Sequence, residues 1–138
     1  MYTKFTGALV AGVVFGFLIG MTAALFCLLP VSFVLMLIAG VFAVLLARND
    51  IRNATDALIS SGTAGGISGV VGTAVATVGI ILITYLSRYM NYQPYTLREL
   101  AGGGIYALFC APVLVVAGVI LAAIGGYVYY ELAVKRAV

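Results

Sequence analysis

The sequence predicts an all-α polytopic integral membrane protein, a four-transmembrane-helix bundle whose helices meet along glycine and alanine seams. Hydrophobic residues make up 64% of the 138 residues and charged residues only 8%, whereas a soluble domain is about one quarter charged. Long uncharged runs separate short polar segments, and the first run, residues 5–29, exceeds the about 20 residues that cross a bilayer as a helix. We therefore expect a single transmembrane domain over residues 1–138.

The first expected span, residues 5–29, carries a row of small residues at every fourth position. The row consists of Ala8, Gly12, Gly16, Gly20 and Ala24. In lipid, small residues let two helix backbones approach closely, and packing drives association there. A four-residue step advances about 400° around the helix, so the row drifts by about 40° per step. We expect a partner helix that follows the row to cross it in the right-handed sense, at about −40°.

A proline separates the first span from the second, which we place at residues 31–47. Pro30 disfavours a helical conformation for the residue before it, and one helix over residues 5–47 would be about 64 Å long, twice a bilayer core. The chain is therefore expected to turn here, so that the two spans form a tight hairpin. The second span has its own small row, a candidate partner for the glycine row of the first: Ala39, Ala43 and Ala47.

The third span, expected at residues 57–86, follows the one dense polar segment, residues 48–56. Its small residues are spaced four, three, four and three apart, and they are Gly65, Gly69, Gly72, Ala76 and Gly79. This is a seven-residue repeat, which is typical of a left-handed seam between helices. Since the first span predicts the opposite hand, we expect each of these two spans to pack against a different neighbour.

The start of the fourth helix is the clearest local signal in the sequence. Thr96 and Glu99 form a capping box, in which Thr96 is the N-cap and Glu99 reaches back from the third helical position. The helix is expected to continue over residues 97–134 with a kink near Pro112, because a proline ring clashes with the carbonyl group four residues earlier. A re-entrant segment at residues 97–111 is the alternative.

The distribution of charge predicts the orientation in the membrane. With four spans, five basic residues lie on one side and two on the other. The five are Lys4, Arg48, Arg52, Lys135 and Arg136, and the two are Arg88 and Arg98. Since cytoplasmic loops carry an excess of basic residues, we expect a multi-pass protein of the plasma membrane with both termini in the cytoplasm.

The sequence offers few side chains for chemistry. It contains no histidine, the commonest metal ligand and general base, and its two cysteines, Cys27 and Cys110, lie far apart in apolar runs. No charged residue falls in the middle of an expected span, which argues against ion-coupled transport. The seven basic side chains are too few and too scattered for a nucleic-acid surface. We therefore assign no catalytic, metal-binding or cofactor-binding residue, and we expect a protein that is not an enzyme.

Over its whole length the chain resembles the short, glycine-rich four-span membrane proteins of unknown function that are found widely in archaea. The resemblance rests on the glycine row before Pro30, on the short Arg/Asp loop at residues 48–56, and on the glycines that open the third span at residues 62–72. It implies an archaeal plasma-membrane location and no particular activity.

Two functions fit these observations. The first is a non-catalytic accessory or structural subunit that lies in the lipid bilayer and assembles with itself or with other integral membrane subunits, since the small rows offer more close-packing surface than one monomer uses. The glycines assigned to helix packing are Gly12, Gly16, Gly20, Gly65, Gly69, Gly72 and Gly79. The alternative is a small channel or permeation pathway, suggested by the serines and threonines of the third span.

Overall fold

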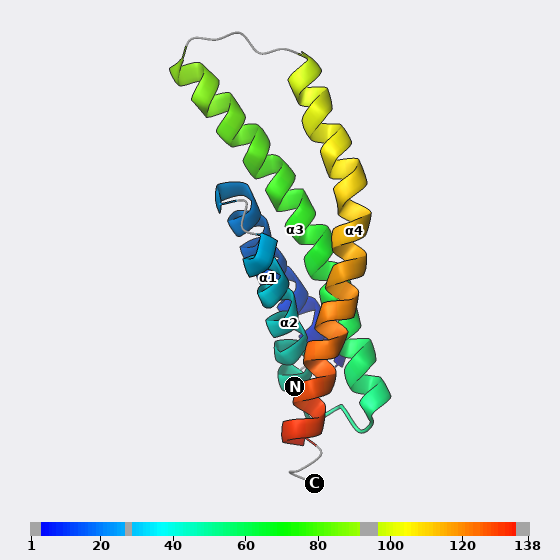
Figure 1. The fold of residues 1–138 in the computed structure, drawn as a ribbon. Coiled ribbons are helices and arrows are strands. Elements are labelled where there is room, and N and C mark those ends of the chain that lie inside the picture. Colours follow the sequence, from blue (N-terminus) through cyan, green and yellow to red (C-terminus); the bar gives the residue numbers. More distant parts are fainter. Residues whose placement is uncertain (1–3, 27–28, 92–96, 135–138) are drawn as a thin grey trace.

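The computed structural model describes residues 4–26, 29–91 and 97–134, and within these ranges it contains helices and no strand (Figure 1). Four α-helices follow one another along the chain, and the last continues into a π-helical turn. They are α1 (Lys4–Phe26), α2 (Leu29–Leu46), α3 (Ala54–Met90), α4 (Leu97–Tyr129) and the π-helix η1 (Tyr130–Val134). The predicted all-α class is confirmed for the described residues.

Three of these helices are long and apolar enough to cross a membrane. The qualifying segments are Phe5–Ala23 in α1, Ala54–Met90 in α3 and Ala111–Ala133, which runs from α4 into η1. The apolar stretch of α2, Val31–Leu46, is shorter. Large apolar side chains are exposed along all four α-helices, as expected where the surroundings are lipid and not water. The described residues thus form an all-helical fold that is consistent with a multi-pass membrane protein.

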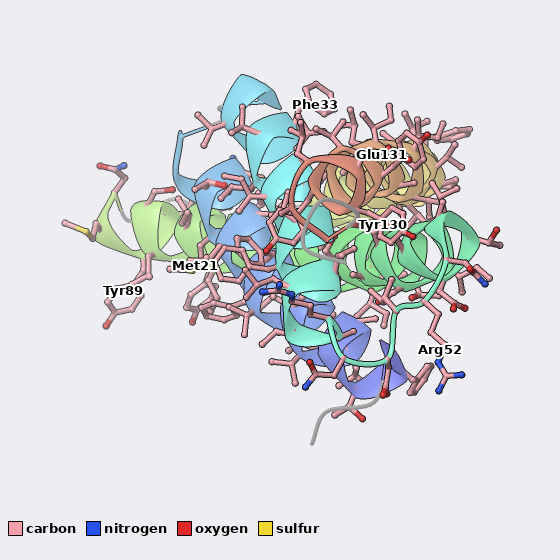
Figure 2. The ribbon with its side chains drawn as sticks, turned by 90° about the horizontal axis from the view of Figure 1, so that it is seen from below. Met21, Phe33, Arg52, Tyr89, Tyr130 and Glu131 are labelled. Carbon is pink, nitrogen blue, oxygen red and sulfur yellow. The ribbon has the colours of Figure 1, made fainter. Side chains whose placement is uncertain are left out.

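The helices form two antiparallel hairpins that lie side by side (Figure 1). α3 packs against both α1 and α4, while α2 packs against the same two helices and less extensively against α3. α1 and α4 therefore occupy opposite corners of the bundle, as the view along its length in Figure 2 shows. In this arrangement α1 runs parallel to α3, its main partner.

The second hairpin is much longer than the first. α3 has 37 residues and α4 has 33, whereas α1 has 23 and α2 has 18. At 1.5 Å per residue, α3 is about 56 Å long and α2 about 27 Å. The far ends of α3 and α4 extend beyond the α1–α2 hairpin and diverge from each other there (Figure 1). The buried residues of α3 accordingly end at Gly72.

The helix bounds differ from the expected spans mainly at two places. α2 begins at Leu29 and includes Pro30 in its first turn, where the missing N–H of proline costs no intrahelical hydrogen bond. α3 extends past both ends of the expected span, to Ala54 on one side and Met90 on the other. Both differences lengthen a helix at its ends, where a hydrophobicity pattern carries little information.

α4 is one continuous helix through Pro112. Its yellow and orange segments run in different directions in Figure 1, so the helix bends in its middle, where the sequence predicts a kink. The backbone of residues 97–111 does not adopt the re-entrant alternative, because no turn interrupts it. Thr96 and the side chain of Glu99 lie outside the described residues, so their capping box stays a prediction, although α4 does begin directly after Thr96.

Candidate helix-packing site

The glycine row of α1 lies against α3. Each of three glycines faces one branched side chain of α3, and the pairs are Gly12–Ile67, Gly16–Val71 and Gly20–Val75. A Cβ atom built on these glycines would lie only 2.7, 2.8 and 2.5 Å from the Cβ atom of the partner. Since carbon atoms that are not bonded attract best at about 3.5–4.0 Å, even an alanine here would force the two helices apart.

The backbones of α1 and α3 approach each other at the same three places. The carbonyl oxygens of Ala64, Ser68 and Gly72 would lie 2.9, 2.9 and 2.8 Å from a Cβ atom on the three glycines. Small residues allow this close approach of two backbones in lipid. α3 thus presents both its branched side chains and its carbonyl groups to the face of α1 that lacks side chains.

Only the beginning of the small row of α1 faces the alanine row of α2. Ala43 packs with Ala8 and Ala11 of α1 and with Ala64 of α3, in one buried cluster. Because the small row of α1 drifts by about 40° with every four residues, its beginning faces α2 and its later glycines face α3. The partner that the sequence suggested is therefore found only at Ala8, whereas Gly12, Gly16 and Gly20 contact α3.

The small residues of α3 are divided between two neighbours. Gly65 and Gly69 face α4, because a Cβ atom on Gly65 would collide with the carbonyl oxygen of Gly118, and one on Gly69 would lie 2.8 Å from the Cα atom of Val115. Gly72 faces α1 instead. α3 is therefore the common partner of α1 and α4, and its small residues do not form one seam.

The upper part of this row makes looser contacts. A Cβ atom on Gly72 would lie 3.2 Å from Cγ2 of Ile19, which is tight but leaves room for a small adjustment. Gly79 is half-buried and lies beyond the last buried residue of α3. The crossing hands expected from the two glycine rows stay predictions.

Four glycines outside the predicted set make further close contacts between helices. They are Gly40 in α2 and Gly118, Gly125 and Gly126 in α4. A Cβ atom on Gly40 would collide with the carbonyl group of Ala122, and one on Gly125 with the carbonyl oxygen of Leu37. The Gly40 and Gly125 contacts join α2 to α4, whereas Gly118 and Gly126 meet Gly65 and Ser61 of α3.

A signal for the α4 contacts is present in the sequence. Gly118, Ala122 and Gly125 are spaced four and three apart, which is the same spacing that singles out the row in α3. Applying one criterion to both helices would have found them. Gly40 has no such signal, because it stands among large apolar residues with no other glycine on α2.

The packing of the monomer does not require glycine at positions 62 and 66 of α3. A Cβ atom on Gly62 would lie 3.8 Å from Cγ1 of Val119, and one on Gly66 would lie 3.4 Å from Cγ2 of the same valine. Both distances correspond to ordinary van der Waals contact. Gly62 and Gly66 are one helical turn apart, so they share a face of α3.

Gly66 forms part of an open groove of about 520 Å³. We call this the α3 groove, and its lining residues are Phe5, Thr63, Gly66, Ile67, Val70, Val71 and Val115. The groove runs along α3 where α1 and α4 flank it, since those two helices lie at opposite corners of the bundle. Its lining is apolar apart from the hydroxyl group of Thr63, which donates hydrogen bonds to the carbonyl oxygens of Ile59 and Ser60, both at 2.8 Å.

The hydroxyl groups of α3 donate to carbonyl groups of their own helix. Ser61 donates to the carbonyl of Ala57 at 2.6 Å and Ser68 to that of Gly65 at 2.9 Å. The threonines do the same three or four residues back, and they are Thr63, Thr73, Thr77 and Thr84. Among the described residues, every buried side-chain nitrogen or oxygen atom has a hydrogen-bond partner. The hydrogen bonds of these hydroxyl groups are therefore made within α3 itself. They do not form a polar pathway between helices.

The end of the bundle that carries the α2–α3 loop is closed by two tyrosines, one at the end of α4 and one at the start of η1. Tyr129 and Tyr130 pack against a buried cluster of Val44, Ala47, Ile51 and Ala57. The hydroxyl group of Tyr130 also donates to the carbonyl oxygen of Arg52, at 3.4 Å, while the Arg52 side chain points outward (Figure 2). The π-helical turn that begins at Tyr130 was not expected from the sequence.

Neither chemistry nor known relatives identify a further site. Within the described ranges, no three or more histidine, cysteine, aspartate or glutamate side chains lie close enough to hold a metal ion. Comparison of the chain with protein-family models, curated proteins and solved structures gives no match. The structure shows a helical bundle with three helices long and apolar enough to cross a membrane, and the function has to be inferred from the geometry of this chain.

Proposed function

We propose that this chain is a non-catalytic subunit of a membrane assembly, which joins a second copy of itself or another integral membrane subunit through α3. The observation that carries the proposal is the α3 groove, which Gly66 lines, together with Gly62 one helical turn earlier on the same face of α3. A helix that packs on this groove would approach the α3 backbone closely at Gly62 and Gly66, which have the four-residue spacing of a common dimerisation motif in membrane helices.

Comparison with the other glycines of the bundle supports this proposal. Nine described glycines would each place a Cβ atom within 3.0 Å of a neighbouring helix, so their size is explained inside the monomer. Gly62 and Gly66 are not explained in this way, although glycine costs about 1 kcal/mol relative to alanine within a helix. A partner helix from outside the monomer would explain why these two positions carry glycine although alanine would favour the helix.

The membrane arrangement that goes with this proposal has four embedded helices. α2 is the fourth, because it is apolar and packs along α1 and α4, both of which are long enough to cross a membrane. Glycine and alanine seams hold the bundle together. Following the charge distribution, both termini lie in the cytoplasm and the bilayer is the plasma membrane.

Two neighbouring glycines provide a matched pair of variants for testing the proposal. Gly66→Leu places a large side chain in the groove, with only an ordinary contact to Val119. Gly65→Leu, one residue earlier, drives a side chain into the Gly118 carbonyl of α4. We expect Gly66→Leu to keep the wild-type unfolding profile and lose the assembly, whereas Gly65→Leu loses the fold itself.

The assembly is measured by native mass spectrometry after gentle solubilisation, with cross-linking in native membranes as a second readout. Wild-type protein is expected as an oligomer or with a co-purifying membrane protein. A wild-type monomer with nothing attached, or a Gly66→Leu variant that assembles like the wild type, would count decisively against the proposal.

The alternative, a permeation pathway, is tested on the same preparations. The bonding of the α3 hydroxyls to their own helix favours the packing function over a polar pathway. Solute flux or conductance in liposomes that contain the pure protein would establish the alternative, and tight, silent bilayers would reject it.

A further inference from the structure

The contacts between α1 and α3 fix the relative heights of these two parallel helices. Gly12 meets Ala64 and Ile67, Gly16 meets Ser68 and Val71, and Gly20 meets Gly72 and Val75. The difference in residue number is therefore 52 or 55 at each contact (64 − 12 and 67 − 12, and likewise for the other two glycines). Phe26 ends α1 six residues after Gly20, so it lies level with residues 78–81 of α3.

α3 continues well beyond this level. It ends at Met90, nine to twelve residues further on, which corresponds to about 14–18 Å along the helix axis. α4 accompanies it, since Figure 1 shows both helices passing the α1–α2 hairpin. We call the part of these two helices that lies beyond the hairpin the α3–α4 arm.

At the level where α1 ends, α3 has no polar face. Ile80, Ile81, Leu82 and Ile83 are 40%, 38%, 54% and 43% exposed. Four consecutive residues cover the full circumference of a helix at about 100° each. A helix that exposes large apolar side chains in every direction requires hydrocarbon around it, because no orientation would hide them from water.

The residues typical of a membrane surface come later on α3. Tyr85, Arg88 and Tyr89 follow this apolar turn, whereas residues 5–47, which include all of the α1–α2 hairpin after its first residue, contain neither a charged residue nor a tyrosine. Tyrosine and basic residues are the usual anchors at the boundary between lipid and water. The arm has such anchors at its end, and the hairpin lacks them at its tip.

We propose that the end of α1 and the start of α2 remain inside the bilayer, so that only α3 and α4 reach the far membrane surface. Lipid acyl chains of that leaflet then surround the α3–α4 arm above the hairpin. The cytoplasmic placement of both termini is unchanged, because the hairpin returns to the side from which it enters. This inference depends on the membrane location alone and not on assembly through the α3 groove.

Single cysteines test the depth of each end of the bundle. In a background with Cys27→Ala and Cys110→Ala, the variant Val31→Cys probes the start of α2, Asn91→Cys the end of α3, and Asn49→Cys the α2–α3 loop. Val31, Asn91 and Asn49 are all exposed, so protein does not shield a label at any of them. A bulky polyethylene glycol maleimide that cannot cross membranes is added to one side or the other of sealed vesicles.

We expect Asn91→Cys to react from one side only and Asn49→Cys from the opposite side only. Val31→Cys is expected to react from neither side until detergent dissolves the membrane. Reaction of Val31→Cys from the same side as Asn91→Cys would overturn the inference.

A spin label at each cysteine gives an independent measurement. At position 31, collisions with oxygen, which concentrates in lipid, should exceed collisions with a water-soluble nickel chelate, and at position 91 the order should reverse. A label at position 31 that meets the nickel chelate as often as the label at position 91 would contradict the proposed depth, whatever the maleimide reaction gives.

Discussion

At the level of single residues, the bundle separates glycines that face another backbone from glycines that face open space. Gly16 and Gly40 belong to the first kind, since a Cβ atom on either would overlap a neighbouring helix. Gly66 belongs to the second kind. The same substitution should therefore have opposite effects at different glycines.

Gly16→Ile should destabilise the protein by about 1–3 kcal/mol, because it forces a branched side chain against Val71 and the carbonyl oxygen of Ser68. Val14→Ile is the matched control on the same helix, since Val14 is 51% exposed and a surface change of this kind is worth within about 0.5 kcal/mol. Unfolding titrations in mixed detergent micelles measure both. Equal stabilities for the two variants would show that the glycine row does not hold α1 against α3.

Gly40→Ala and Gly66→Ala are expected to change the free energy of unfolding in different directions. Alanine favours a helix over glycine by about 1 kcal/mol, so Gly66→Ala should leave the free energy of unfolding unchanged or raise it. Gly40→Ala should lower it, since the new methyl group meets the carbonyl group of Ala122 and the backbones must separate. The same titrations compare the two, and a stabilised Gly40→Ala variant would refute the close α2–α4 contact.

Several of these residues could be recognised from the sequence, and others could not. The α1 row is visible because four-residue spacing of glycine is conspicuous among large side chains, and the row does lie in a helix contact. The sequence suggested α2 as the partner of this row, whereas its three glycines meet α3, because spacing defines a face of a helix but not the neighbour on that face. Gly40 was missed for a related reason, since a lone glycine has no spacing.

At the level of elements, α3 connects the bundle by packing against every other α-helix. Its serines and threonines bond to their own backbone, and its glycines contact α1 and α4. The helix bounds followed largely from the uncharged runs and from proline and polar breaks. The extra length at both ends of α3 did not, because a helix can continue into polar residues that hydropathy assigns to loops.

Thr73→Val and Thr77→Val test the role of the α3 hydroxyls. Each hydroxyl group donates to a carbonyl oxygen that already belongs to the helix, at 2.7 and 2.8 Å, so its loss should cost only about 0.6 kcal/mol. The double variant should unfold nearly like the wild type and leave the permeability of liposomes unchanged. A specific change in solute flux would instead indicate that these hydroxyls line a pathway.

At the level of the whole molecule, the two hairpins differ in length, and this difference shapes the surface toward the far leaflet. The sequence gives each run its length, but it does not give their relative heights, which depend on the register between α1 and α3. That register is fixed by side chains of one helix seated over glycines of another, so it became visible only once the partners were known.

The parallel packing of α1 on α3 is tested most directly by a disulfide across it. A Cβ atom on Gly72 would lie 3.5 Å from Cβ of Ile19, which is within the range of about 3.5–4.5 Å that a disulfide needs. With Cys27 and Cys110 replaced by alanine, Ile19→Cys/Gly72→Cys should form an intramolecular disulfide in membranes under mild oxidation. The control Phe17→Cys/Gly72→Cys should not, since Phe17 is exposed on another face of α1. Failure of the first pair to cross-link, or equal cross-linking by both, would contradict the packing of α1 against α3 on which the bundle depends.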